Sequence, residues 1–223
     1  MKIGVFDSGK GGTTVLAAIK KCIPDADYCY IADSKNCPYG EKSKQELLTI
    51  TQDIVNRLTD WGADIIVIAC NTATTRCIES LRNMYPNMCF VGTEPAIRLA
   101  AKTGAKNILV MATPGTIESE RTTQLLTESQ KPGQKFELLA CPGLADATET
   151  NSDVDEKLRE LLTNCSKDYD TVVLGCTHYS LIKDKIQSFF PKAVLIDGNE
   201  GVAKRVKKLA EQIQTCGKPV ENI

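Results

Sequence analysis

A thiol, a hydroxyl and an imidazole occupy consecutive positions at Cys176, Thr177 and His178. The run 171–174 and then Gly175 precede them, as expected for a buried strand of a parallel sheet that ends in a sharp turn. His178 is the single histidine of the chain. A cysteine this close to a histidine could act as a nucleophile or as an acid and base, because an imidazole can accept the thiol proton.

A second thiol follows a similar apolar run in the first half of the chain. Residues 65–69 lead into Cys70, Asn71 and Thr72. Cys70 and Cys176 stand 176 − 70 = 106 positions apart, close to half of the 223 residues. Two thiols at matching strand ends predict one site that is assembled from two similar halves.

Other segments repeat with nearly the same spacing. The repeated segments, in order, are 3–9 with 109–115, Cys37-Pro38 with Cys141-Pro142, and Glu94 with Glu200. Strands and helices alternate within each half, which is typical of parallel α/β units. The sequence therefore predicts an α/β fold of two similar domains, related by internal duplication about a pseudo-twofold axis, each with a mainly parallel sheet flanked by helices. Residues 1–93 with a returning helix at 204–223 are expected to form the first domain, and 94–203 the second.

The elements that position these residues can be placed from hydrophobic periodicity. Strands are expected at 2–6, 28–32, 65–69, 88–91, 108–111, 136–139, 171–174 and 194–196. Helices are expected at 13–21, 41–60, from about 74, from about 94, from 116 to about 130, at 153–164 and near the C-terminus. Ligands of parallel sheets bind beyond the carboxyl ends of the strands. The residues expected at these ends, in one cleft between the domains, are Asp7, Cys70, Thr113 and Cys176.

The loop 7–12, with the sequence Asp-Ser-Gly-Lys-Gly-Gly, joins a strand to a helix. Backbone amides at a helix N-terminus favour an anion there. Lys10 is followed by Gly11, so the loop is not a Walker phosphate loop, and the glycine spacing also fails the dinucleotide pattern. A carboxylate or a zwitterionic ligand fits this loop better than a nucleotide, and a tight turn without a ligand is the alternative.

Composition narrows the class of protein. Apolar residues make up 42% of the chain and charged residues 25%, with a net charge of −1, as in ordinary soluble globular proteins. No basic stripe indicates a nucleic-acid partner. No apolar run is long enough to span a membrane and no signal peptide is recognised, so we expect a cytoplasmic protein without a membrane partner.

The ten cysteines need a separate explanation. Reduced thiols are the rule in the cytoplasm, and cysteine is often a small buried residue, which fits Cys29 and Cys89 within strand-like runs. No Cys-x-x-Cys pair occurs, and one histidine cannot complete a usual Cys/His zinc set, so no metal is expected. No lysine stands in a recognisable pyridoxal-phosphate context, and no cofactor is expected.

Several of these segments together resemble the glutamate racemases of the cofactor-independent aspartate/glutamate racemase superfamily. The matching segments are 4–9 with Gly11-Gly12, Pro38-Tyr39-Gly40, 69–73, Glu94-Pro95-Ala96 and 174–179. The chain departs from the family at Lys10, where an apolar residue is usual, at Ser180, where proline is usual, and in being shorter. The resemblance implies interconversion of L- and D-glutamate without a cofactor, in the service of peptidoglycan synthesis, cell wall biogenesis and cell shape.

The resemblance also implies roles for individual residues. Cys70 and Cys176 would be the two bases. Asp7 would act beside Cys70, and His178 with Glu149 would act beside Cys176. The residues implied to bind the substrate are Asp7, Ser8, Pro38, Tyr39, Gly40, Asn71, Thr72, Thr113, Thr116, Thr177 and His178. An acidic amino acid is the implied small-molecule substrate, and the resemblance allows a homodimer.

Two opposed thiols suit racemisation, because a hydrogen must leave one face of the α-carbon and a proton must return to the other. A thiol with its ordinary pKa of about 8.5 is mostly protonated at neutral pH, so one member of the pair can be a thiolate while the other stays a thiol. Exchange of these two states would give the reverse reaction.

Other functions remain open at this point. A cysteine-dependent hydrolase or transferase, or an isomerase or decarboxylase of the same superfamily, would need only one of Cys70 and Cys176. A two-domain protein that only binds an amino acid would need neither. Aspartate differs from glutamate by one methylene, which these motifs do not distinguish.

Overall fold

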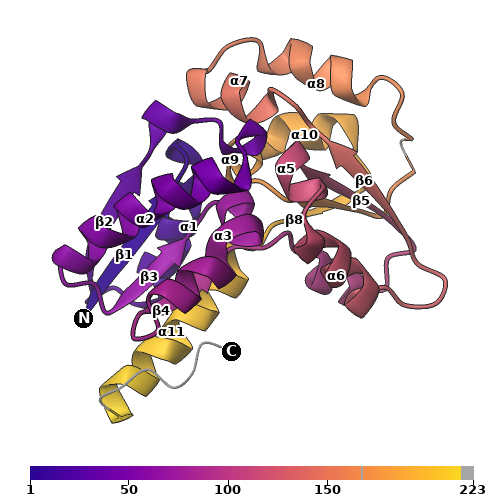
Figure 1. The fold of residues 1–223 in the computed structure, drawn as a ribbon. Coiled ribbons are helices and arrows are strands. Elements are labelled where there is room, and N and C mark those ends of the chain that lie inside the picture. Colours follow the sequence, from indigo (N-terminus) through magenta and orange to yellow (C-terminus); the bar gives the residue numbers. More distant parts are fainter. Residues whose placement is uncertain (167, 217–223) are drawn as a thin grey trace.

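A computed structural model describes residues 1–166 and 168–216, and they form two α/β halves (Figure 1). Each half is built on a four-stranded sheet whose neighbouring strands are all parallel. The strand orders are β2-β1-β3-β4 and β6-β5-β7-β8. The same order is therefore used twice, and the predicted fold class of two similar parallel α/β domains is confirmed.

The eight strands follow one another in the order that the sequence predicts, and helices α9 and α10, like α7 below, were not predicted. The elements of the first half are β1 (Lys2–Asp7), η1 (Lys10–Gly12), α1 (Thr13–Cys22), β2 (Asp27–Ala32), η2 (Ser34–Asn36), η3 (Tyr39–Glu41), α2 (Lys44–Asp60), β3 (Ile65–Ile68), α3 (Asn71–Met84) and β4 (Cys89–Gly92). Those that follow are α4 (Ile97–Lys102), β5 (Asn107–Ala112), α5 (Pro114–Ile117), α6 (Glu120–Ser129), β6 (Lys135–Ala140), α7 (Leu144–Thr150), α8 (Val154–Leu162), β7 (Thr171–Leu174), α9 (Thr177–Leu181), α10 (Lys183–Phe189), β8 (Val194–Ile196) and α11 (Asn199–Cys216).

Strand β3 shows why the central strands are apolar throughout. All four of its residues are buried, and successive side chains point to opposite faces of the sheet. Ile66 and Ile68 pack into the hydrophobic cluster under α2 and α3, whereas Ile65 and Val67 pack into the cluster on the other face. Helices thus cover both faces of the sheet, which is the usual arrangement for parallel strands.

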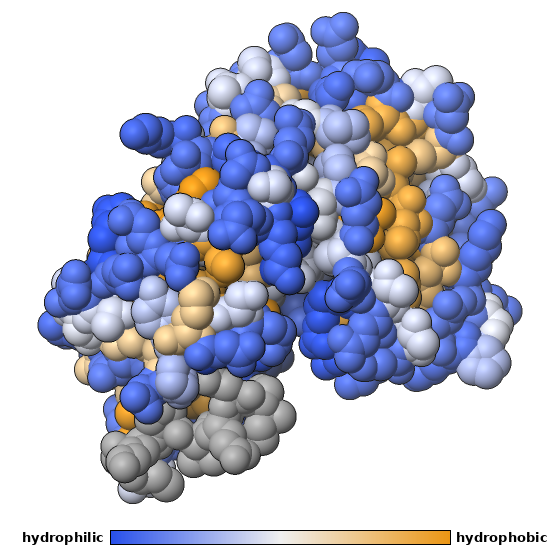
Figure 2. Space-filling model, in the orientation of Figure 1, coloured by the Kyte–Doolittle hydropathy of each residue, from blue (hydrophilic) through white to orange (hydrophobic). Residues whose placement is uncertain are grey.

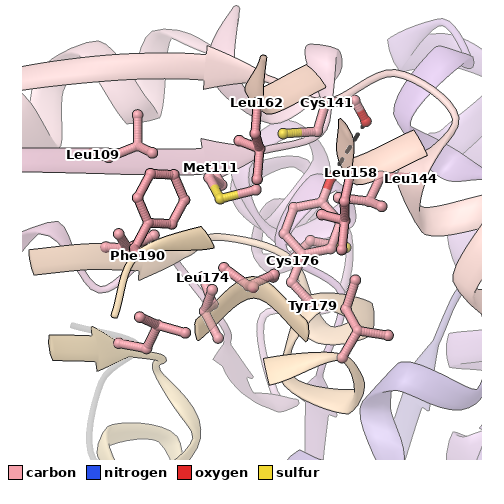
Figure 3. Packing of buried hydrophobic residues seen from close by; sticks show 14 of the residues in the cluster. Leu109, Met111, Cys141, Leu144, Leu158, Leu162, Leu174, Cys176, Tyr179 and Phe190 are labelled. Atoms are coloured by element: carbon pink, nitrogen blue, oxygen red, sulfur yellow. Dashed lines mark hydrogen bonds between the residues drawn. The ribbon is translucent and has the colours of Figure 1, made fainter. Parts of the chain in front are cut away.

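The hydrophobic core of the second half reaches directly to one of the two thiols. Figure 3 shows Cys176 beside Leu174, Met111 and Tyr179, with Phe190 farther along the same cluster. The Tyr179 hydroxyl donates a hydrogen bond of 3.3 Å to the carbonyl oxygen of Cys141. Because protein interiors are close-packed, this cluster holds the start of α9 in one position relative to the sheet.

The last helix, α11, follows β8 in the chain but packs on the first half. It lies against α1, and it is the yellow helix that runs beside the first sheet in Figure 1. Val206 and Leu209 of this helix share a core cluster with Ile3 and Val5 of β1. The domain boundaries expected at residues 94 and 204 stay predictions, and residues 217–223 of the returning segment lie outside the described residues.

Several element boundaries differ from the prediction for identifiable reasons. Helix α3 begins at Asn71, not near residue 74, so Cys70 itself is its N-cap. The single helix expected over 116–130 is two helices, because α5 ends at Ile117 and Ser119 starts α6 as its N-cap by accepting a hydrogen bond from the amide of Thr122. Helix α7 was not predicted; it is short and begins after Gly143, whose φ is +73°.

Polar side chains cover most of the face seen in Figure 2. Within residues 1–166 and 168–216, no helix is long and apolar enough to cross a membrane. The surface is hollowed where the two halves join, between α6 and α11, and a cavity of about 450 Å³ lies there. The residues that line this cavity include neither Cys70 nor Cys176, so it is separate from the thiols.

Candidate active site

The two cysteines occupy equivalent positions just beyond the carboxyl ends of β3 and β7. Each is the N-cap residue of the next helix, Cys70 of α3 and Cys176 of α9. Both are buried, with 5% and 7% of their surfaces exposed. Asp7 and Cys70 follow the neighbouring strands β1 and β3, and Thr177, the residue after Cys176, donates a hydrogen bond to Asp7. These contacts bring the two cysteine-bearing strand ends together at the boundary between the halves.

The surroundings of Cys70 favour the neutral thiol. Burial, followed by the charge of Asp7, raises its pKa to about 12. The hydroxyl of Ser8 and the backbone amides of Thr72 and Ala73 act in the opposite direction, because they form hydrogen bonds with the sulfur that favour the thiolate. A positive charge brought close to the sulfur would add to this effect and lower the pKa further.

Asp7 is fully buried at the end of β1 and joins the two halves. Its carboxylate accepts hydrogen bonds from the amide of Gly12, at 2.8 Å, and from the amide of Gly9, at 3.4 Å. The hydroxyl of Thr177 in the second half donates to both carboxylate oxygens at 3.3 Å. Burial raises the pKa of Asp7; these amides, and a positive charge on His178 when that ring is protonated, act in the opposite direction. A carboxyl group with a raised pKa is a better proton acceptor than an ordinary aspartate.

Cys176 begins a chain of polar contacts that leads away from the site. Its sulfur lies 3.8 Å from Nδ1 of His178, and Nε2 of His178 lies 2.8 Å from Oε2 of Glu149. Burial would raise the pKa of Glu149, but hydrogen bonds from the Lys10 amide, the Ser34 hydroxyl and His178 outweigh it and hold the pKa below its ordinary value. An ionised Glu149 accepts the Nε2 proton, so Nδ1 of a neutral His178 is free to accept a proton from Cys176.

The pKa of Cys176 is also raised well above its ordinary value. Burial is the main cause, and a negative charge on Cys70 adds to it. The backbone amide of His178 acts in the opposite direction. The arrangement therefore holds one mobile proton on each sulfur, with a proton acceptor beside each: Asp7 near Cys70, and His178 near Cys176.

Three buried threonines form a ring of hydroxyl groups between the halves. The hydroxyl of Thr72 on α3 lies 2.9 Å from that of Thr113 and 3.1 Å from that of Thr116. Thr113 and Thr116, at the start of α5, are 3.0 Å apart. A carboxylate could replace these mutual hydrogen bonds, because each hydroxyl can donate one bond.

The remaining predicted binding residues also lie near the ends of these strands. A Cβ atom added to Gly40 would lie 2.8 Å from Cβ of Thr113, so the turn that follows Pro38 approaches the second half closely. Tyr39 is buried and donates from its hydroxyl to Asp33 at 2.6 Å. The Oδ1 atom of Asn71 is buried and has no hydrogen-bond partner among the described residues, which makes it an available acceptor for an ammonium group.

The structure therefore brings together the residues that the sequence indicated at the strand ends. It also shows neighbours that the sequence analysis did not assign. Lys10, Ser34 and Asn151 belong to the contacts around Glu149, and the position of Lys10 inside the glycine loop was the only signal for them. Cys37 is a third thiol near the site, since the Ser8 hydroxyl forms hydrogen bonds with both Cys37 and Cys70; its place directly before Pro38 could have indicated this.

Comparison with known proteins places this geometry in a family. A family model described as Asp/Glu/Hydantoin racemase matches residues 12–206. A glutamate racemase of Sulfurovum sp. is 39% identical over 221 residues, which cover 95% of this chain and 83% of that protein. A glutamate racemase of Aliarcobacter butzleri is 40% identical over 222 residues, covering 95% and 85%.

Solved structures give the same result. The crystal structure of Escherichia coli glutamate racemase in complex with L-glutamate and the activator UDP-MurNAc-Ala has a TM-score of 0.84 and 31% identity, over 99% of this chain and 84% of that one. A glutamate racemase isoform of Bacillus anthracis has a TM-score of 0.81 and 31% identity, over 99% and 84%.

Proposed function

Because the chain belongs to the Asp/Glu/hydantoin racemase family, we propose that it interconverts L- and D-glutamate by moving the α-proton between two thiols. The protein is an amino-acid racemase, and hence an isomerase. The observation that carries the mechanism is the placement of Cys70 and Cys176 at equivalent strand ends of two facing halves. A hydrolase or transferase would use only one of these thiols.

The protonation states explain how the reaction starts. With pKa values raised by burial, both sulfurs carry protons at neutral pH until the substrate arrives. The ammonium group of glutamate would bring a positive charge near them and favour one thiolate. Asp7 would take the proton from Cys70 for one direction of the reaction, and His178 with Glu149 would take it from Cys176 for the other.

The substrate would lie between the halves, with its polar groups on the buried donors and acceptors. The Oδ1 atom of Asn71 is available for the ammonium group. The threonine ring of Thr72, Thr113 and Thr116 offers hydroxyl donors to a carboxylate. Ser8 and Thr177 are buried beside Cys70 and Asp7 and would hold the other carboxylate. Pro38, Tyr39 and Gly40 would close the site from the first half.

The cellular role follows from the product. D-glutamate would supply peptidoglycan synthesis and thus cell wall biogenesis and cell shape. We place the enzyme in the cytoplasm, because the two-base reaction requires both thiols to stay reduced. A homodimer is part of the proposal, and sedimentation equilibrium at micromolar concentration should then give twice the mass of the chain.

The reaction is tested by incubating the protein with L-glutamate in deuterium oxide without added cofactor. D-glutamate should appear, and both enantiomers should acquire deuterium at the α-carbon. The absence of both products would refute the racemase function. The same assay with L-aspartate separates the two acidic substrates, and faster turnover of aspartate would reassign the substrate.

The two thiols are tested by Cys70→Ser and Cys176→Ser. Each should lower kcat by about 10³-fold or more, because serine is a far weaker acid and general acid–base groups contribute roughly 10²–10⁴-fold. Cys22→Ser, at the end of α1 and outside the site, is the matched control and should keep full activity. Full activity in either active-site variant would contradict the two-base mechanism.

A further inference from the structure

Lys10 makes contacts that an apolar residue could not make. It begins η1, directly after the loop that follows β1, and is half-buried. Its ammonium group donates hydrogen bonds of 2.8 Å to the carbonyl oxygen of Glu149 and to Oδ1 of Asn151. Its backbone amide donates a third, also of 2.8 Å, to Oε2 of Glu149. All three cross from the first half to the second.

The partner of Lys10 is the end of α7, a helix of seven residues. Asn151 caps this helix in the left-handed conformation, with φ of +56°. The last carbonyl groups of a helix lack partners within the helix, and a cation is favourable beside them. The ammonium group of Lys10 therefore fixes both the final turn of α7 and the cap that ends it.

The position of α7 decides where the carboxylate of Glu149 lies, and this carboxylate is the partner of His178. Oε2 of Glu149 is 2.8 Å from Nε2 of His178, and Nδ1 of the same ring faces the sulfur of Cys176. The loop also packs tightly on the carboxylate, since a Cβ atom added to Gly9 would come within 2.8 Å of both its oxygens. A shift of the end of α7 would thus be passed to the ring beside Cys176.

We propose that Lys10 is a positioning residue that ties α7 to the glycine loop and holds Glu149 and His178 in register with Cys176. Lys10 does not touch the reacting atoms. Its backbone contact with Glu149 would survive substitution, and only the two ammonium contacts would be lost. Substitution of Lys10 should therefore slow proton transfer at Cys176 and leave proton transfer at Cys70 unchanged. This inference rests on the proposed racemase function.

The test compares Lys10→Met with Lys10→Arg and with Lys21→Met. Methionine keeps the length of the side chain but removes its charge, and kcat/KM should fall roughly tenfold, the equivalent of about 1.4 kcal/mol. Arginine keeps a charged donor and should restore at least half of the activity. Lys21, exposed near the end of α1, is the matched control, and its variant should behave as the wild type.

A second measurement separates positioning from a general loss of structure. α-Deuterated L- and D-glutamate give a primary isotope effect for each direction. If proton transfer at Cys176 is slowed, the isotope effect should rise in the direction in which Cys176 removes the α-hydrogen. It should fall in the opposite direction. The quantity to compare is the ratio of the isotope effects in the two directions. Glu149→Gln sets the reference for this ratio, because it alters the partner of His178 directly, and Lys10→Met should change the ratio in the same sense.

The outcomes are distinct. A wild-type ratio of isotope effects in Lys10→Met would overturn the positioning role, even if activity fell. If Lys10→Met does not fold, Asn151→Gly removes one ammonium partner while keeping the left-handed cap, and it should change the ratio in the same sense by a smaller amount; an unchanged ratio there would overturn the role. A wild-type protein that racemises nothing would refute the proposed function and this role together.

Discussion

At the residue scale, the site combines weakly acidic thiols with neighbours that can take their protons. Burial raises the pKa values of Cys70, Cys176 and Asp7 alike. In the proposed mechanism, the same burial would keep water away from the deprotonated α-carbon, so that solvent could not return a proton to either face. A buried environment that disfavours ionised groups is thus suited to a reaction in which only one of the two thiols is ionised at a time.

Asp7 should limit the stability of the protein at neutral pH. Its raised pKa means that the folded state favours the protonated carboxyl, so the associated stability is present at low pH and is lost as the pH rises through that pKa. Asp7→Asn, which is never ionised, should raise Tm by roughly 2–4 °C at pH 7 and lower kcat by about 10²-fold or more.

Differential scanning calorimetry at several pH values measures this effect. The gap in Tm between Asp7→Asn and the wild type should shrink between pH 7 and pH 3.5. Asp53→Asn, on the exposed face of α2, is the control and should show little change at either pH. A gap as large at pH 3.5 as at pH 7 would mean that ionisation of Asp7 is not the cause.

At the scale of elements, each of the two thiols is placed by a strand and held by the helix that it caps. The start of α9 is additionally pressed against η1 of the first half. Glycine is required there for space, since a Cβ atom on Gly11 would lie 2.6 Å from the backbone nitrogen of His178 and 2.7 Å from the hydroxyl oxygen of Thr177. The two halves approach each other through this contact.

Gly11→Ala should therefore displace α9 and lower kcat/KM at least tenfold. The added methyl group meets backbone, which cannot turn away as a flexible side chain can. Gly201→Ala is the matched control, because nothing lies within 4 Å of a Cβ atom there, and it should stay within about twofold of the wild type. Steady-state kinetics in both directions measure the effect, and an active Gly11→Ala enzyme would show that this close contact is dispensable.

At the scale of the whole molecule, the site exists only where the two halves meet. The threonine ring joins α3 to α5, the carboxylate of Asp7 accepts from Thr177, and Lys10 reaches α7. A substrate held by both halves would stabilise their contact. Ligand binding to the folded state alone stabilises a protein by about 2.7 kcal/mol at 100 times the Kd.

Glutamate should accordingly raise the Tm of the protein, and above the Kd the shift should grow with the logarithm of the glutamate concentration. At 100 times the Kd the shift should be roughly 5–11 °C, because 1 kcal/mol corresponds to about 2–4 °C for a chain of this size. Thr72→Val, which removes one hydroxyl of the threonine ring, should give a smaller shift at the same concentration. Sodium chloride of equal ionic strength is the control, and a shift of equal size with salt would mean that glutamate does not bind specifically.

The sequence by itself determined the eight strands and the chemical groups that follow them. Strands such as Ile65–Ile68 are apolar throughout because they are buried on both faces, so hydrophobic runs revealed them. The thiols follow these strands directly, and the repeated spacing of Cys70 and Cys176 indicated that they share a site. The apolar runs and the thiols that follow them are local features, and the repeat is found by comparing two such segments. None of them depends on how the halves are packed.

Only the tertiary structure decided which further side chains hold the groups beside each thiol. Glu149 accepts hydrogen bonds from Lys10, Ser34 and His178, and its contact with Lys10 joins residues 139 positions apart. No local pattern encodes such a contact, because it depends on the angle and distance at which two separate cores meet. The raised pKa values have the same origin, since burial of the thiols is a property of the assembled halves.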